Sequence, residues 1–178
     1  MSRISRLKFD FKYMILNHFI NNIPFWNVRK FFYSLFGLKI GKQSRIGIKT
    51  VIVEPKNIKI GDRTIINENC HLDGRGGIEI ENDTSISFGT VIITGTHDSN
   101  DKFKYKTEKV IIKDHVWIGT HAIILNGSII ESYSIIGAGC VFKTKSNKNE
   151  IFVGNPARKI KERENIEDYK IEYKPFFR

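Results

Sequence analysis

The stretch from Ile112 to Phe142 reads IKDHVWIGTHAIILNGSIIESYSIIGAGCVF and repeats every six residues. Its sixes are IKDHVW, IGTHAI, ILNGSI, IESYSI and IGAGCV, and FKTKSN completes the series at Asn147. Isoleucine opens each of the first five, and the fifth place always holds a small residue: Val, Ala, Ser or Cys. A helix has a period of 3.6 and a strand a period of two, so a period of six indicates neither a helix nor a simple hairpin.

The same period extends back to Ile40, which makes it an internal repeat rather than a local accident. Series of three sixes begin at Ile40, Ile60 and Ile80. Pairs of additional residues shift the register between the series, namely Ile58–Lys59, Ile78–Glu79 and Val110–Ile111. The series from Ile80 also carries a polar insertion, residues 98–109. We interpret the insertion as a loop that leaves one corner of a coil.

A triangular solenoid accounts for this pattern. Each six supplies one short strand whose opening Ile, Leu or Val points into the core, and the small fifth residue turns inward near the corner. Polar residues and glycine form the corners, where the backbone needs unusual dihedral angles. Three sixes complete one coil, and successive coils stack into parallel sheets. Cys70 and Cys140 both occupy the fifth place, so we expect them to be core spacers rather than nucleophiles.

Residues 1–37 form a basic, aromatic segment that precedes the solenoid. Residues 1–36 hold six Lys or Arg and one acid, Asp10. Apolar residues at helical spacing predict two helices, which Pro24 separates and Gly37 ends. One interpretation is a helical cap packed on the solenoid. The other is an amphipathic element that rests on an anionic membrane surface.

The solenoid, residues 38–147, gives way to a C-terminal segment, residues 148–178. An alternating, strand-like piece leads to Gly154-Asn155-Pro156, and a charged helix or tail follows. The open end of a solenoid has to be covered. We therefore expect residues 148–178 to form a strand and helix cap on which Phe176 and Phe177 pack.

Composition narrows the classes of protein. A chain of 178 residues with 40% hydrophobic and 27% charged residues is typical of a single globular domain. The net charge of +10 favours polyanionic partners, such as a phosphorylated cofactor or an acidic membrane face. Two cysteines make no disulfide framework, and no nucleic-acid-binding motif is present. With no run of about 18 apolar residues and no signal-peptide cleavage site, the expected location is the cytoplasm, at the inner membrane face if residues 1–36 bind there.

Several motifs resemble the left-handed β-helix acyltransferases of the hexapeptide-repeat family. They are GTHD, DHVWIGTHAII, SIIGAGCVF and VGNPARKI, within a likeness that runs from about Gly37 to Lys161. The nearest likeness is to galactoside, maltose and capsular-polysaccharide O-acetyltransferases, and residues 1–36 resemble the N-terminal region of exopolysaccharide acetyltransferases. The resemblance implies a left-handed coil, a homotrimer with active sites between subunits, and acetyl-CoA as donor.

His97 is the candidate catalytic residue. A sugar hydroxyl is a very weak acid, and a general base with a pKa near neutrality assists its attack on a thioester. His97 stands where the coil gives way to the loop and matches the catalytic position of the family. The resemblance also assigns acceptor binding to Asn67 and Asp73, with a saccharide or glycolipid as the acceptor.

The resemblance places the donor along the later coils. The pantetheine arm of CoA would lie along backbone groups, beside an aromatic wall, with basic residues on the phosphates. The matching residues are Trp117, Gly119, Thr120, Gly137, Ala138, Lys143 and Arg158.

Three other functions fit parts of the pattern. An N-acetyltransferase for an amino sugar nucleotide shares the fold, the donor and the histidine. A γ-type carbonic anhydrase needs three converging zinc ligands, and the candidates are His71, His97, His115 and His121. His115 and His121 are six apart, which puts them on adjacent sides of one coil, so we expect no metal. A non-catalytic trimeric scaffold is the third. The favoured function is O-acetylation of a saccharide hydroxyl during surface polysaccharide biosynthesis.

Overall fold

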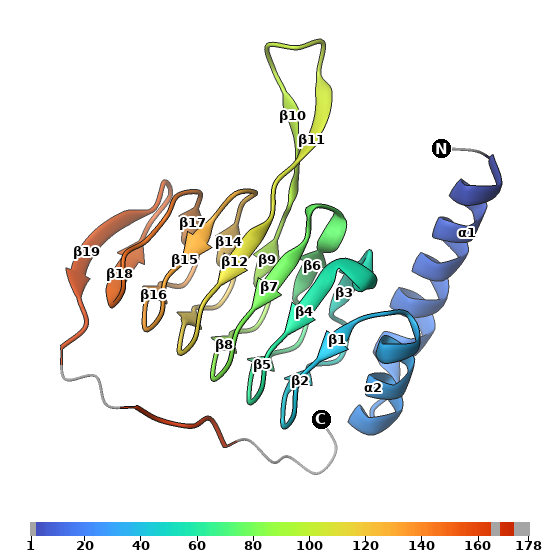
Figure 1. The fold of residues 1–178 in the computed structure, drawn as a ribbon, viewed down its shortest axis with the longest axis horizontal. Helices are drawn as coiled ribbons and strands as arrows, with labels where there is room; N and C mark the ends of the chain where they lie inside the picture. Colours follow the sequence, from blue (N-terminus) through green and yellow to red (C-terminus); the bar gives the residue numbers. More distant parts are fainter. Residues whose placement is uncertain (1–2, 165–167, 173–178) are drawn as a thin grey trace.

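The computed structural model describes residues 3–164 and 168–172. Three sheets form the sides of a solenoid, and Figure 1 shows helices at its N-terminal end and a hairpin that projects from its middle. The expected packing of Phe176 and Phe177 concerns residues outside the described ranges.

Three parallel sheets confirm the solenoid that the six-residue period predicts. The first has the order β1-β4-β7-β12-β15, with β1 Lys39–Ile40, β4 Ile58–Ile60, β7 Ile78–Ile80, β12 Val110–Ile112 and β15 Ile129–Ile130. The second has the parallel order β18-β16-β13-β8-β5-β2, with β2 Arg45–Ile46, β5 Ile65–Ile66, β8 Ser85–Ile86, β13 Trp117–Ile118, β16 Ile135–Ile136 and β18 Glu150–Val153. One further strand, β19 Arg158–Glu162, pairs antiparallel with β18 at the edge of this sheet. The third has the order β17-β14-β9-β6-β3, with β3 Val51–Val53, β6 His71–Asp73, β9 Val91–Ile92, β14 Ile123–Ile124 and β17 Val141–Phe142.

The core consists of the residues that the repeat assigns to it. The opening aliphatic side chains, such as Ile86, Ile118 and Ile136, are fully buried in a single hydrophobic cluster. Cys70 and Cys140 are buried among them, and burial raises the pKa of Cys70 to about 12 and raises that of Cys140 as well. Both thiols are therefore protonated core spacers, as the sequence predicts.

The turns form three corners, which we name by what lies on them. The tail corner comprises turns 41–44, 61–64, 81–84, 113–116 and 131–134, between the first and second sheets. The tryptophan corner comprises turns 47–50, 67–70, 87–90, 119–122 and 137–140, between the second and third. The hairpin corner comprises turns 54–57, 74–77, 93–109, 125–128 and 143–146, where the chain returns to the first sheet. Left-handed backbone recurs at corners, at Arg63, Asn69 and His115 for example, although it costs roughly 1–2 kcal/mol outside glycine.

The additional dipeptides lengthen one side of the early coils. Ile58, Ile78 and Val110 open three-residue strands that pair in register, Val110 with Ile78 and Ile78 with Ile58. The insertion forms an antiparallel hairpin, β10 Gly95–Asp98 and β11 Lys104–Thr107, which Figure 1 shows rising from the solenoid. The interruption of the repeat is therefore an ordered structure attached to one corner.

Residues 3–36 close the N-terminal end of the solenoid, as the cap interpretation predicts. The elements are α1 Arg3–Met14, the π-helix Ile15–Phe19, the 3-10 helix Ile20–Asn22 and α2 Trp26–Leu35. Asn17 exchanges two hydrogen bonds with the backbone of Ile52 on the exposed edge strand β3. Arg29, fully buried, donates through Nη2 to the Ile46 carbonyl at 2.8 Å and through Nη1 to that of Ile23 at 2.5 Å. Side chains thus satisfy backbone groups that an unpaired edge would leave open.

The helices also leave apolar surface uncovered. No residue of α1 is buried. The exposed large apolar side chains of the segment are Ile4, Leu7, Phe11, Met14, Phe19, Phe25, Val28, Phe31 and Leu35.

The C-terminal segment corrects one expectation. Residues Arg158–Glu162 form strand β19, antiparallel to β18, where the sequence predicted a charged helix or tail. The strand covers the open edge of β18, which a helix would have left without backbone partners.

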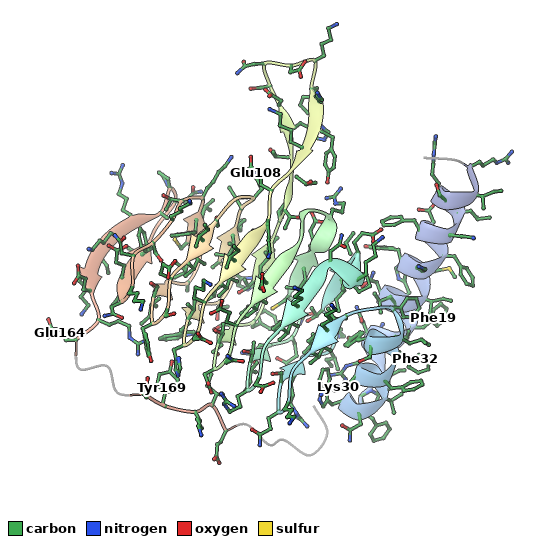
Figure 2. All side chains as sticks on the ribbon, viewed as in Figure 1. Phe19, Lys30, Phe32, Glu108, Glu164 and Tyr169 are labelled. Atoms are coloured by element: carbon green, nitrogen blue, oxygen red, sulfur yellow. The ribbon has the colours of Figure 1, made fainter. Side chains whose placement is uncertain are left out.

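Residues 168–172 then lie along the tail corner. The Ile171 N–H donates to Asp83 Oδ1 at 3.0 Å, and the His115 ring stacks on Tyr133 and meets the Tyr169 ring edge-on. Figure 2 shows Tyr169 on this side of the molecule.

Candidate active site

His97 stands on β10, paired with Tyr105 one position before the turn of the hairpin, and its ring is exposed. Its Nδ1 lies 2.9 Å from the carbonyl oxygen of Phe103. A carbonyl only accepts hydrogen bonds, so Nδ1 carries the proton of the neutral imidazole. Nε2 is then left with a free lone pair, which is the state that a general base requires.

Two aromatic residues of the hairpin fix the plane of this imidazole. Phe103 stacks on it with ring centroids 4.2 Å apart and planes 8° apart. Tyr105, the register partner of His97 on β11, meets it edge-on at 5.3 Å. Neither residue was predicted from the sequence, because the insertion has no periodicity that reveals which side chains face His97.

Behind Tyr105 lies an ion pair. The Arg75 guanidinium sits 5.3 Å over the Tyr105 ring and donates through Nε and Nη2 to both oxygens of Asp73, each at 2.8 Å. Asp73 is 1% exposed. Burial acts to raise the pKa of Asp73, but hydrogen bonds from the Arg75 side chain and backbone N–H outweigh burial and hold the pKa below its ordinary 3.8. In this chain the Asp73 carboxylate is thus occupied by Arg75, and Arg75 is the group nearer to Tyr105.

The tryptophan corner brings together most of the residues assigned to the donor. In one ladder, a backbone N–H of each coil donates to a carbonyl oxygen of the next coil toward the C-terminus: Asn67 to Ile86, Ser87 to Ile118, Gly119 to Ile136 and Gly137 to Phe152. Trp117 begins β13 beside this ladder, half exposed, and its Nε1–H donates to Ser87 Oγ at 3.1 Å. Thr120 follows Gly119 and Ala138 follows Gly137, so the two residues occupy equivalent positions in their turns.

At Gly119 this ladder brings two coils into close approach. A Cβ at Gly119 would lie 2.5 Å from the backbone nitrogen of Ala138, so no side chain fits without moving the next coil. Phe88 and His121 lie on the same corner, with rings 5.3 Å apart, and Phe88 is another exposed aromatic residue that the sequence analysis missed.

The two candidate phosphate-binding residues lie toward the C-terminal end. Lys143 is exposed and directly follows β17 on the hairpin corner. Arg158 is exposed at the start of β19, paired with Val153.

The single chain therefore divides the candidate residues between two corners. His97, Asp73 and Lys143 lie on the hairpin corner, and Arg158 lies on β19 at the C-terminal end. Asn67, Trp117, Gly119, Thr120, Gly137 and Ala138 lie on or beside the tryptophan corner. The third sheet separates the two groups.

The four histidines considered as zinc ligands lie apart. His71 is on the third sheet, His97 on the hairpin, His115 on the tail corner and His121 on the tryptophan corner. Within residues 3–164 and 168–172, no three His, Cys, Asp or Glu side chains form a group that could hold a metal ion.

Comparison with known proteins places this architecture in a family. The family described as bacterial transferase hexapeptide (six repeats) matches residues 109–144. An Escherichia coli K12 protein named "Putative colanic acid biosynthesis acetyltransferase WcaF" is 31% identical over 141 residues, which are 78% of this chain and 77% of that protein. The chain belongs to the hexapeptide-repeat acetyltransferases.

Solved structures share the fold of this acetyltransferase. A maltose O-acetyltransferase of Clostridium difficile 630 superposes with a TM-score of 0.84 at 25% identity, covering 92% of this chain and 90% of that one. A hexapeptide-repeat acetyltransferase of Vibrio cholerae, crystallised with acetyl-CoA, gives a TM-score of 0.84 at 24% identity and 92% coverage of both chains. At 92% coverage of this chain, the likeness extends beyond the solenoid.

Proposed function

We propose that this acetyltransferase moves an acetyl group from acetyl-CoA to a hydroxyl of a saccharide, with His97 as general base. The observation that carries the proposal is the contact of His97 Nδ1 with the Phe103 carbonyl, because in the neutral imidazole it places the proton on Nδ1 and the lone pair on Nε2. The names of its relatives support the reaction class: acetyltransferase WcaF for colanic acid biosynthesis and the maltose O-acetyltransferase. The proposed reaction would take part in the synthesis of a surface polysaccharide.

In the proposed reaction, His97 Nε2 takes the hydroxyl proton as the acceptor oxygen bonds to the thioester carbonyl carbon. The imidazolium that forms keeps its Nδ1–H bond to the Phe103 carbonyl, which stabilises the added charge. When the carbon–sulfur bond breaks, the imidazolium returns this proton to the departing CoA thiolate. The products are an acetyl ester, free CoA and neutral His97. No acyl-enzyme is needed, and the buried thiols of Cys70 and Cys140 are unsuited to form one.

Acetyl-CoA fits the tryptophan corner. Trp117 offers an exposed indole face, and the close-packed coils at Gly119 and Gly137 leave a surface of backbone rather than side chains. Thr120 and Ala138 extend this surface, and Lys143 and Arg158 supply positive charge at the C-terminal end for the phosphates. The acetyl-CoA complex of the Vibrio cholerae protein supports this choice of donor.

A homotrimer would complete the active site. His97 and the donor surface lie on different corners of one chain, so a neighbouring subunit has to bring the second group to the first. A trimer with closed rotational symmetry has three equivalent interfaces, and each would provide this contact. Asn67 on the tryptophan corner would then meet the acceptor across the boundary from His97.

The reaction is tested with the purified trimer, acetyl-CoA and a panel of neutral glycosides, amino sugars and nucleotide sugars, with free CoA as the readout. We expect turnover with hydroxyl acceptors and a product whose acetyl group is released by mild alkali. An alkali-stable product on an amino sugar would instead establish the N-acetyltransferase alternative. NMR of the product identifies the modified position.

Residues 3–36 would hold the enzyme on an anionic membrane. Among the described residues, no helix is long and apolar enough to span a bilayer. Yet α1 exposes Ile4, Leu7 and Phe11, and α2 exposes Phe31, beside the cations Arg3, Arg6, Lys8 and Lys12. Apolar insertion combined with basic charge is typical of helices that lie in a membrane interface. Threefold symmetry would present three such surfaces on one side of the assembly.

We expect the protein to sediment with vesicles of phosphatidylglycerol and phosphatidylcholine but not with phosphatidylcholine alone. The triple substitution Leu7→Ser, Phe11→Ser and Phe31→Ser should weaken this binding at least about tenfold, since each side chain loses apolar area that it could insert. Ile160→Ser, at the opposite end, removes an equally exposed side chain and should have no effect. Equal vesicle binding by the triple variant and the wild type would contradict the assignment.

A further inference from the structure

A basic groove runs along the hairpin corner between the N-terminal cap and the hairpin. It has a volume of about 430 Å³. Its lining consists of Lys56, Asn57, Lys59, Arg75, Gly76, Gly77, Ile78 and Lys109. Four of these side chains are cationic and none is acidic.

The cations of the groove are only partly neutralised by their surroundings. Lys56 pairs with Glu54 at 3.3 Å, Arg75 with Asp73 at 2.8 Å, and Lys109 with Glu79. Lys59 on β4 is exposed and makes no ion pair with any described residue. Its positive charge contributes, with those of Lys109 and Lys113, to the lowered pKa of Glu79, in which the hydrogen bond from Lys109 has the largest part. The groove thus retains positive charge with no assigned partner.

The groove lies next to Tyr105, the aromatic residue that contacts His97. Arg75 in its wall sits over the Tyr105 ring, and that ring contacts His97. Gly76 packs against the foot of the hairpin, where an added Cβ would lie 3.0 Å from side-chain atoms of both Thr94 and Thr107. A group bound in the groove is therefore separated from His97 by one aromatic side chain.

The other end of the groove meets an apolar pocket beneath α1. This pocket has a volume of about 260 Å³ and shares Lys56 with the groove. Its lining consists of Ser5, Lys8, Phe9, Lys12, Tyr13, Leu16, Phe36, Ile52, Val53, Glu54, Pro55 and Lys56. The turns of Lys56, Arg75 and the hairpin belong to three successive coils. Neighbouring coils are about 4.8 Å apart, so the path from Lys56 to the hairpin is about 10 Å along the solenoid.

We propose that the basic groove binds the diphosphate of a lipid-linked saccharide acceptor, with the lipid entering the pocket beneath α1 and the sugar reaching His97. The inference rests on the proposed function and adds the class of acceptor. Phosphate oxygens suit the lysines and Arg75 as charge-assisted partners. The order apolar pocket, cationic groove, general base matches the order lipid, diphosphate, sugar in such a molecule. This path, extended by the two residues of β10 from Gly95 to His97, leaves room for a diphosphate and one sugar ring.

The test compares the double variant Lys56→Gln and Lys59→Gln with a matched control, Lys42→Gln and Lys170→Gln. The control removes the same charge from exposed lysines at the tail corner. Three acceptors carry the same sugar: a neutral methyl glycoside, a nucleoside diphosphate sugar and a short-chain isoprenyl diphosphate sugar. In the groove variant we expect KM for the isoprenyl diphosphate sugar to rise at least about tenfold, with kcat and the KM for acetyl-CoA unchanged. The KM for the methyl glycoside should not change, and the control should match the wild type throughout.

Binding of inorganic pyrophosphate, measured by calorimetry without acetyl-CoA, provides a readout that does not depend on transfer. We expect the wild type and the control to bind it and the groove variant to lose at least about tenfold in affinity. Equal binding by all three proteins would overturn the proposal. Wild-type KM values that do not differ between the isoprenyl and nucleoside compounds would overturn the lipid assignment. Pyrophosphate binding in the groove without transfer to any acceptor would overturn the proposed function and leave the anion site standing.

Discussion

Replacing His97 with alanine is expected to lower kcat for acetyl transfer by about 10² to 10⁴-fold, the range that a positioned general base contributes. The KM for acetyl-CoA should stay within about twofold, because most residues assigned to the donor lie on another corner of the chain. The measurement is steady-state release of CoA with the best acceptor of the panel. The hairpin should persist in the variant, since its strands pair through four registered positions.

His18→Ala provides the matched control. His18 is also exposed, but it lies in the N-terminal cap, so its loss should leave kcat unchanged. Circular dichroism and sedimentation of both variants show whether the solenoid and its assembly are intact. A His97→Ala trimer that is correctly assembled and turns over at the wild-type rate would remove the proposed mechanism.

Replacing Arg29 with alanine is expected to destabilise the protein by about 3–5 kcal/mol, because buried groups lose their partners and a cavity opens. The guanidinium donates to the carbonyls of Ile23, Pro24 and Ile46 and lies 5.6 Å over the ring of Trp26. Its loss would leave the buried Ile46 carbonyl unpaired where the cap joins the first coil. Burial lowers the pKa of Arg29, which remains a cation at every pH of interest.

Denaturant unfolding at fixed protein concentration measures the change. Asn27→Ala, an exposed substitution on the same helix, is the control and should alter stability by less than about 0.5 kcal/mol. Arg29→Lys should recover little, since an ammonium cannot reach three carbonyls with the geometry of the guanidinium. An Arg29→Ala protein as stable as the Asn27→Ala protein would show that the cap is held mainly by its apolar contacts.

The repeat made most of the solenoid predictable from the sequence. A period of six fixes which side chains point inward, because each opening residue must occupy the same place in its coil. The buried Ile86, Ile118 and Ile136 follow from this rule, as do the two buried cysteines. The additional dipeptides could also be placed from the sequence. A shift of two residues keeps the alternation of inward and outward side chains along a strand.

The remainder depended on contacts between segments without periodicity. Phe103 and Tyr105 flank His97 only because the insertion closes as a hairpin with that particular register. Strand β19 forms because β18 offers an open edge, a condition that is absent from the local sequence of Arg158–Glu162. The ion pair between Asp73 and Arg75 depends on the tight turn at residues 74–76. The sequence alone therefore did not predict that Arg75 would occupy the Asp73 carboxylate.

The segment 168–172 has a consequence for how copies of this chain could associate. A closed ring of three joins two different surfaces of each subunit, one for either neighbour. The chain's own C-terminal segment already lies against Asp83 and His115, along one of the three long edges of the prism. Docking through that edge would require this segment to be displaced. The two edges left for neighbours are the ones that bear the imidazole and the indole, so the same contact that closes the ring would bring the base to the thioester.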